Sequence, residues 1–190
     1  MSGDVKEINE QKAMQYFAKL DELVNPGTVL FIIGGSAIAL LGAKIRVTAD
    51  IDVALPYSKI DIAAFIKASI MAGIPVDPGF GYQGAYIEMV RPMMLTLPTP
   101  VEGQEIVLFP GKNLTVKTCS AADLAASKLY RFGDQDREDI QFLVQVCGVT
   151  FEQVEESVSR LPPRFRDDVL VRDNLENLRM DMAMWREVQQ

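Results

Sequence analysis

The apolar positions along the chain alternate between helical and strand-like spacing. Residues 1–25 place apolar side chains, among them Val5, Phe17 and Leu20, three or four positions apart with charges between them, which is typical of an amphipathic helix. An apolar run at residues 29–33 then ends at a glycine pair, and a short Ala/Leu-rich helical pattern follows. With a second strand expected at residues 50–56, the pattern predicts strand, turn, helix and strand in succession.

A second helix is expected at residues 58–72. Ser58 could cap it, Ile62, Ile66 and Ile70 form one apolar stripe, and Gly73 ends it. Strands joined by helices indicate an α/β (α+β) fold with a mixed sheet flanked by helices.

The second half of the chain turns from strands to helices. Strands are expected near residues 86–90 and at 114–118, and Ser120 has the position of a helix cap. From Thr150 onward the pattern is helical. We therefore expect an α/β core with an N-terminal helix at residues 1–118 and a helical C-terminal extension at 119–190, packed on the core.

Two acids lie one residue apart in the second strand. Because strand side chains alternate between faces, Asp50 and Asp52 point the same way while Ile51 points into apolar packing. Two carboxylates this close repel each other unless a cation lies between them. Oxygen ligands alone favour Mg²⁺ (or Mn²⁺) over zinc, so the pair is a candidate metal site.

The glycine pair supplies a candidate phosphate site. Gly34 and Gly35 allow a sharp turn and close approach of a ligand to the backbone, and Ser36 could cap the helix that follows. Backbone N–H groups at a helix start suit a phosphate.

Gly-Gly-Ser, residues 37–49, and then Asp-Ile-Asp, with Arg46 and Thr48 just before the acids, resemble the signature of the nucleotidyltransferase superfamily that includes DNA polymerase beta. Within it, the chain is similar to a small prokaryotic branch containing the abortive-infection (AbiE) toxins and the minimal nucleotidyltransferases. A second stretch, residues 123–140, resembles the helical Lys and Asp motifs of those toxin-like proteins. The resemblance spans roughly residues 24–146 and implies a nucleotidyltransferase-like sheet.

The resemblance assigns roles to individual residues. Asp50 and Asp52 would be catalytic and hold the metal, and a third carboxylate is expected on a later strand: Glu88 fits best, with Glu105 as the alternative or no third acid at all. Nucleotide contacts are implied for residues before the acids and in the second stretch, namely Gly34, Gly35, Ser36, Arg46, Thr48, Lys128 and Arg131. For Asp136 and Asp139 a catalytic role and a pairing with Lys128 or Arg131 both stay open.

Other interpretations of these stretches exist. A glycine pair after a strand is often only a turn, and acids flanking an isoleucine can be the solvated face of an edge strand. Asp50-Ile51-Asp52 also resembles the opening motif of haloacid-dehalogenase-like phosphatases, but Lys44, Arg46 and Thr48 interrupt the apolar strand that this class requires. The Gly/Pro-rich segment at 74–86 is typical of a surface loop, or of a border of the nucleotide site where Tyr82 stacks on a base.

Composition narrows the function classes. A net charge of −7 argues against broad, non-specific nucleic-acid binding. The chain has no histidine, which excludes Ser-His-Asp triads and histidine-containing zinc sites. Cys119 and Cys147 are expected to be buried free thiols, and without a secretory signal or a membrane span the protein is expected in the cytoplasm.

The leading hypothesis is a metal-dependent nucleotidyltransferase that moves an NMP from an NTP to an acceptor hydroxyl of RNA, protein or a small molecule. The resemblance adds a toxin role in a toxin–antitoxin or phage-defence system, with an antitoxin as partner. The alternative is a catalytically inactive nucleotide-binding or toxin–antitoxin partner protein of the same fold.

Overall fold

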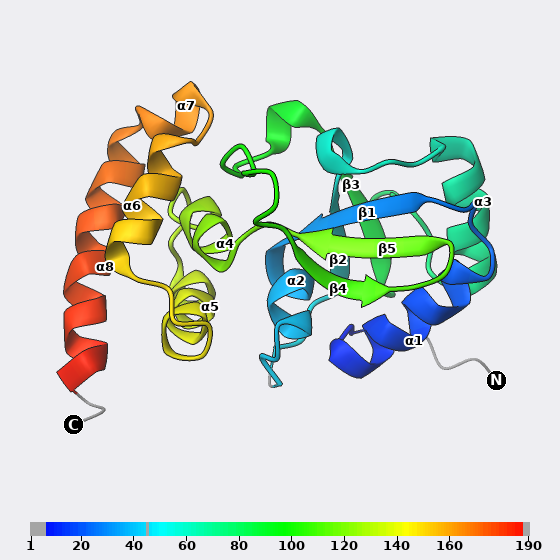
Figure 1. Ribbon diagram of the computed structural model, residues 1–190, viewed down its shortest axis with the longest axis horizontal. Helices are drawn as coiled ribbons and strands as arrows, with labels where there is room; N and C mark the ends of the chain where they lie inside the picture. The colour runs from blue at the N-terminus through cyan, green and yellow to red at the C-terminus, as the bar shows by residue number, and fades with distance from the viewer. Residues whose placement is uncertain (1–6, 45, 188–190) are drawn as a thin grey trace. The chain divides into compact units, whose positions relative to one another are not determined.

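The computed structural model describes residues 7–44 and 46–187. Within them, the chain forms two compact units: one takes its residues from Met1–Leu95 and Ile106–Thr118, and the other from Thr96–Glu105 and Cys119–Gln190. The first unit holds the sheet and the second is helical (Figure 1). This confirms the predicted α/β (α+β) class with a mixed sheet and a helical C-terminal region.

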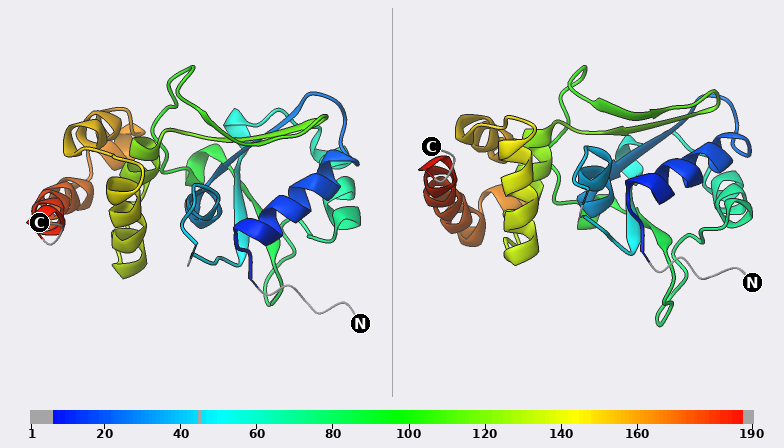
Figure 2. Two further views of the ribbon diagram at one scale, coloured as in Figure 1. Left: turned by 60° about the horizontal axis from the view of Figure 1, so that its bottom comes forward. Right: turned by 90° about the horizontal axis from the view of Figure 1, so that it is seen from below.

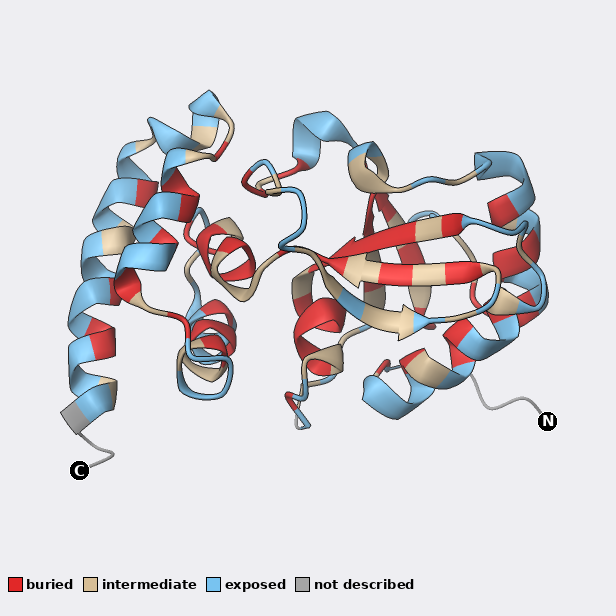
Figure 3. Ribbon diagram, viewed as in Figure 1, coloured by how far each residue is buried: buried red, intermediate tan, exposed pale blue. Residues whose placement is uncertain are grey.

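The sheet has five strands in the order β3-β2-β1-β5-β4. Their bounds are Thr28–Ile33 for β1, Asp50–Ala54 for β2, Tyr86–Val90 for β3, Ile106–Pro110 for β4 and Leu114–Thr118 for β5. The pairs β1/β5 and β2/β3 are parallel, while β1/β2 and β4/β5 are antiparallel. The apolar run at 29–33 is therefore the central strand, and it is almost wholly buried (Figure 3).

Three helices pack around this sheet. They are α1 at Glu10–Asp21, α2 at Gly34–Leu40 and α3 at Ile62–Ala72. Helix α1 contacts β5, α2 and α3, and α2 contacts β1 and β2 (Figure 2). Asn9 caps α1, which is shorter than the helix predicted for residues 1–25, and Val5 lies outside the described residues.

Helix α3 differs from its prediction in two respects. Its cap is Asp61, whose side chain accepts from the Ala64 N–H, while the Ser58 hydroxyl bonds the backbone of Ala54 and Phe31. The predicted Ile62/Ile66/Ile70 stripe is also wrong as a buried face, because Ile62 and Ile70 are exposed. The helix buries Phe65 and three small residues instead. Its sequence is apolar nearly all round, so spacing alone could not select the buried face.

The second unit is built from five helices within the described chain. They are α4 at Ala121–Ser127, α5 at Asp134–Gln145, α6 at Phe151–Ser159, α7 at Pro163–Arg166 and α8 at Val169–Glu187. The expected Ser120 cap of α4 and the capping box of Thr150 are both present. Helix α4 ends at Ser127, so Lys128 and Arg131 follow it rather than lie on it.

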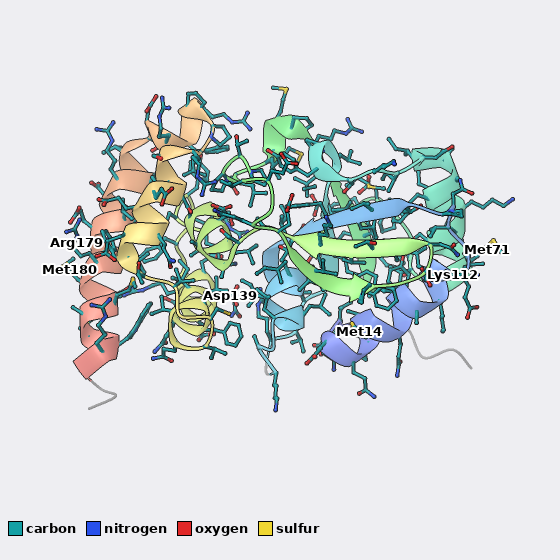
Figure 4. The ribbon with its side chains drawn as sticks, viewed as in Figure 1. Met14, Met71, Lys112, Asp139, Arg179 and Met180 are labelled. Atoms are coloured by element: carbon teal, nitrogen blue, oxygen red, sulfur yellow. The ribbon has the colours of Figure 1, made fainter. Side chains whose placement is uncertain are left out.

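Side-chain burial in the second unit follows the helix faces. Helix α8 carries Arg179 and Met180, both labelled in Figure 4, and Met180 is exposed.

Cys119 is buried but Cys147 is exposed, so the expectation of two buried thiols is wrong for Cys147. Among residues 7–44 and 46–187, no helix is both long and apolar enough to span a membrane.

Candidate active site

The two acids predicted to act together do lie together, and β3 adds a third. In the parallel register of β2 and β3, Asp50 pairs with Tyr86 and Asp52 pairs with Glu88. One carboxylate oxygen from each of Asp50, Asp52 and Glu88 lies within 4.8 Å of the others, and all three side chains are half-buried. We call these three residues the acid cluster.

The glycine turn lies directly against this cluster. Gly34 follows β1, whose last residue pairs with Asp52, and its φ is +69°. A Cβ placed on Gly34 would collide with Oδ2 of the Asp52 carboxylate. Only glycine therefore suits this position, both for its backbone conformation and for the close approach of the acid.

Arg46 covers the next glycine. A Cβ on Gly35 would lie 2.6 Å from Nη2 of Arg46, and Nη1 of the same side chain donates to the Val47 carbonyl at 2.6 Å. The structure thus brings Gly34, Gly35 and Arg46 together beside Asp52, as a phosphate site would require. Gly35 itself is buried under the guanidinium.

Ser36 occupies a different position from the predicted one. The residue before α2 that takes the cap position is Ile33, and no side chain caps the helix. Ser36 is the third residue of α2, is buried, and its hydroxyl donates to the Ile33 carbonyl at 3.3 Å. The prediction that Ser36 is the helix cap is wrong, while its contact with a phosphate stays a prediction.

Thr48 holds Asp50 in place, and Tyr86 lies opposite it on the neighbouring strand. The Thr48 hydroxyl donates to Oδ1 of Asp50 at 2.6 Å, and Tyr86 is the β3 residue that pairs with Asp50. Burial, followed by the charges of Asp50, Glu88 and Asp52, raises the pKa of Tyr86 and so keeps the phenol neutral beside the three acids. Thr48, predicted as a nucleotide contact, is therefore also a positioning residue for Asp50.

Glu88 shows the electrostatic cost of the cluster. Partial burial, and then the charges of Asp50 and Asp77, raise the pKa of Glu88. Glu105, the alternative third acid, belongs to the second unit, where its carboxylate accepts from the Gly103 N–H at 3.0 Å. By geometry, Glu88 is the acid that accompanies Asp50 and Asp52.

The acid cluster fits a divalent cation. Two carboxylate oxygens bound to one Mg²⁺ at about 2.1 Å are at most about 4.2 Å apart. The oxygens here lie within 4.8 Å of one another, so small side-chain rotations would bring them onto one ion. A cation would also stabilise the ionised form of Glu88, whose pKa is raised by burial and then by the charges of Asp50 and Asp77.

The second predicted stretch forms a buried ionic group in the helical unit. The Lys128 ammonium lies 3.0 Å from Oδ1 of Asp136 and 2.7 Å from Oδ2 of Asp139, and all three residues are buried. Arg131 reaches Asp136 at 3.1 Å with its side chain largely exposed. Asp136 and Asp139, the latter labelled on α5 in Figure 4, thus pair with Lys128, which is one of the two roles left open for them.

Sequence reasoning did not identify two residues near the acid cluster. Tyr86 was expected where the loop at 74–86 meets the strand near 86–90, with no role in the site, although its position two residues before Glu88 places both on one strand face. Asp77 lies in the preceding loop, and its Oδ1 accepts from the Met89 N–H at 3.0 Å. No periodic signal marks Asp77, because its position depends on how the loop folds back onto β3.

Most of the chain matches a known protein family. Residues 11–161 match the family described as "Nucleotidyltransferase of unknown function (DUF6036)". No curated protein and no solved structure gave a match to the chain. The match includes the glycine turn, the acid cluster and the buried ionic group of Lys128, Asp136 and Asp139, and it extends over most of the chain. The chain belongs to this family of nucleotidyltransferases.

Proposed function

We propose that the protein transfers a nucleoside monophosphate from an NTP to an acceptor hydroxyl in a Mg²⁺-dependent (or Mn²⁺-dependent) reaction. The observation that carries the proposal is the proximity of Asp50, Asp52 and Glu88 on adjacent strands, directly beside a glycine turn. The family to which the chain belongs supports the same reaction class.

The cation would be held by Asp50 and Asp52, with Glu88 as a further ligand. When bound, it supplies charge neutralisation for the phosphates and for the attacking and leaving oxygens. The Thr48 hydroxyl fixes the Asp50 carboxylate, and the close fit of Gly34 fixes that of Asp52. These contacts hold the acids on rigid strands, so that little reorganisation is needed when substrate binds.

The nucleotide phosphates are assigned to the β1 side of the acids. Gly34 is only half-buried and its N–H belongs to a helix start without a side-chain cap. Arg46 lies against the next residue, Gly35, and a turn of its side chain toward a phosphate would uncover the backbone of Gly35. Contacts of Lys128 and Arg131 with nucleotide remain part of the proposal and rest on the resemblance.

The reaction is an in-line displacement at the α-phosphorus. The acceptor oxygen forms a bond to the α-phosphorus while the bond to the oxygen bridging to the β-phosphate breaks, and pyrophosphate leaves with that oxygen. The acceptor's hydroxyl proton passes to a carboxylate such as Glu88 or to water. The proximity of Glu88 favours this enzyme over the alternative, an inactive binding protein lacking a third acid. A toxin role with an antitoxin partner rests on the resemblance alone.

The test is transfer of label from α-labelled NTPs, each incubated with Mg²⁺, cellular RNA, protein and metabolites. Asp52→Asn should abolish transfer, and Glu22→Gln, which removes an exposed acid at the end of α1, should leave it unchanged. Both variants should unfold like the original protein. Full transfer by Asp52→Asn would disprove the assignment.

A further inference from the structure

A hollow adjoins the acid cluster on one side. It has a volume of about 410 Å³ and is lined by Asp77, Pro78, Gly79, Gly81, Tyr82, Tyr86 and Glu88. This size lies within the range of small-molecule sites. Glu88 belongs both to the hollow and to the acid cluster, so a molecule in the hollow would reach the cluster through Glu88.

The sheet order separates this hollow from the glycine turn. Strand β2, which carries Asp50 and Asp52, lies between β1 and β3. Gly34 follows β1 and lies against Asp52 from that side, whereas Tyr86 and Glu88 belong to β3. If phosphates bind at the glycine turn, the hollow is on the opposite side of the acids, where the attacking molecule must approach for in-line displacement.

The lining of the hollow is acidic and aromatic. Asp77 and Glu88 contribute two carboxylates, Tyr82 and Tyr86 contribute two rings 6.4 Å apart, and none of the described lining residues carries a positive charge. The bond from the Met89 N–H fixes the orientation of the Asp77 carboxylate. Such a lining repels phosphates and attracts an organic cation, because both carboxylates and aromatic faces stabilise a bound cation.

We propose that this hollow is the acceptor subsite, and that the acceptor is a small alcohol bearing a protonated amine. The proposal rests on the proposed function, because it assigns the second substrate of the same site. The amine binds near Asp77 and Tyr82, and the hydroxyl is directed toward Glu88. An RNA acceptor, with a phosphate at every nucleotide, would meet unfavourable charge in this hollow.

The experiment uses three sugars that share one ring and differ in charge: glucosamine, glucose and glucose 6-phosphate. Binding to the full chain is followed by amide NMR shifts, in the presence of Mg²⁺ and a non-hydrolysable NTP analogue. Affinity should fall in that order, with shifts at the hollow. Asp77→Asn should weaken the affinity for glucosamine about fivefold and leave the affinity for glucose unchanged, as expected for loss of one exposed charge-assisted contact.

Nucleotide binding is measured in parallel and separates the two proposals. Asp77→Asn and Tyr82→Ala should bind the NTP analogue as the original protein does, and the Glu22→Gln control should alter neither ligand. The subsite assignment is overturned if the sugars do not bind, if their affinities are independent of charge, or if Tyr82→Ala weakens the nucleotide instead. Failure of the NTP analogue to bind at all would count against the proposed function, while the sugar series would still test the hollow.

Discussion

At the scale of single residues, the site depends on how closely Gly34 approaches Asp52. Gly34→Ala adds a Cβ that collides with the Asp52 carboxylate, at a φ of +69°. We expect roughly 1 kcal/mol of lost stability from the backbone strain, and about a tenfold or greater loss of Mg²⁺-dependent NTP affinity as Asp52 is displaced. Denaturant unfolding and calorimetric titration measure the two effects.

The control for this prediction is Gly42→Ala. Gly42 has a φ of +106°, and a Cβ added there would have no neighbouring atom within 4 Å, so this variant shares the backbone strain without the collision. It should lose comparable stability and keep full nucleotide affinity. Equal nucleotide affinity in both variants would show that the contact with Asp52 has no functional weight.

The second prediction at this scale concerns Lys128 and its two buried partners, Asp136 and Asp139. Lys128→Met would leave the buried carboxylates of Asp136 and Asp139 without their shared cation, which costs about 3–5 kcal/mol. Arg131→Met removes an exposed partner of the same Asp136 and should cost less than about 1 kcal/mol. Chemical denaturation of both variants compares their free energies of unfolding. A similar, small loss in both variants would contradict the structural role of Lys128.

The residues of the acid cluster could be predicted from sequence only in part. Strand alternation is a local rule, so it places Asp50 and Asp52 on one face once the strand is recognised. Glu88 could be assigned to the site only through the family resemblance, because the pairing of β2 with β3 is a long-range property. Tyr86 and Asp77 were not predicted as site residues, because their positions depend on the pairing of β2 with β3 and on the loop before β3.

At the scale of elements, strands were easier to predict than helix ends and faces. The apolar run at 29–33 and the strand expected at 114–118 match β1 and β5 almost residue for residue. In α3, by contrast, both the cap and the buried face differ, because Ser58 and Asp61 are both good caps and the helix has apolar residues on every side. Its exposed Met71 is labelled in Figure 4.

The turn between β4 and β5 is held by a residue from another element. The carboxylate of Asp21, the last residue of α1, accepts from the N–H groups of Lys112, Asn113 and Leu114 at 2.6–3.0 Å. Desolvation alone would raise the pKa of Asp21, but these three hydrogen bonds and the charge of Lys112 outweigh it and lower the pKa. The ionised carboxylate therefore stabilises the fold.

This arrangement predicts a pH-dependent effect of Asp21→Asn. Because the folded-state pKa is lowered, the stabilisation is complete above the ordinary value of 3.8 and is lost as pH falls through the lower folded value. The variant should be less stable by roughly 1 kcal/mol near neutral pH, and the difference should vanish in acid. Denaturant unfolding over this pH range measures it, with Glu22→Gln as the neighbouring control. A difference independent of pH would rule out the charge as its cause.

At the scale of the whole molecule, the chain passes between the two units three times. Residues 96–105 lie between β3 and β4 in sequence but belong to the helical unit. Leu97 in this segment is buried, and Thr99 exchanges hydrogen bonds with Arg160, which also binds the buried Asp123 at 2.6 Å. A sequence pattern cannot reveal such an excursion, because nothing local distinguishes it from a surface connection within the sheet unit.

The boundary expected after residue 118 can be tested on these grounds. A fragment of residues 119–190 lacks the segment that contributes Leu97 and that bonds Arg160, so we expect it to unfold with little cooperativity. Adding a peptide of residues 96–105 should restore a cooperative transition in circular dichroism, in proportion to peptide concentration. A peptide carrying Leu97→Ser should fail, because it would place a polar group in an apolar site. If the fragment alone unfolds as cooperatively as it does with the peptide, the helical unit is complete without residues 96–105, and the boundary after residue 118 holds.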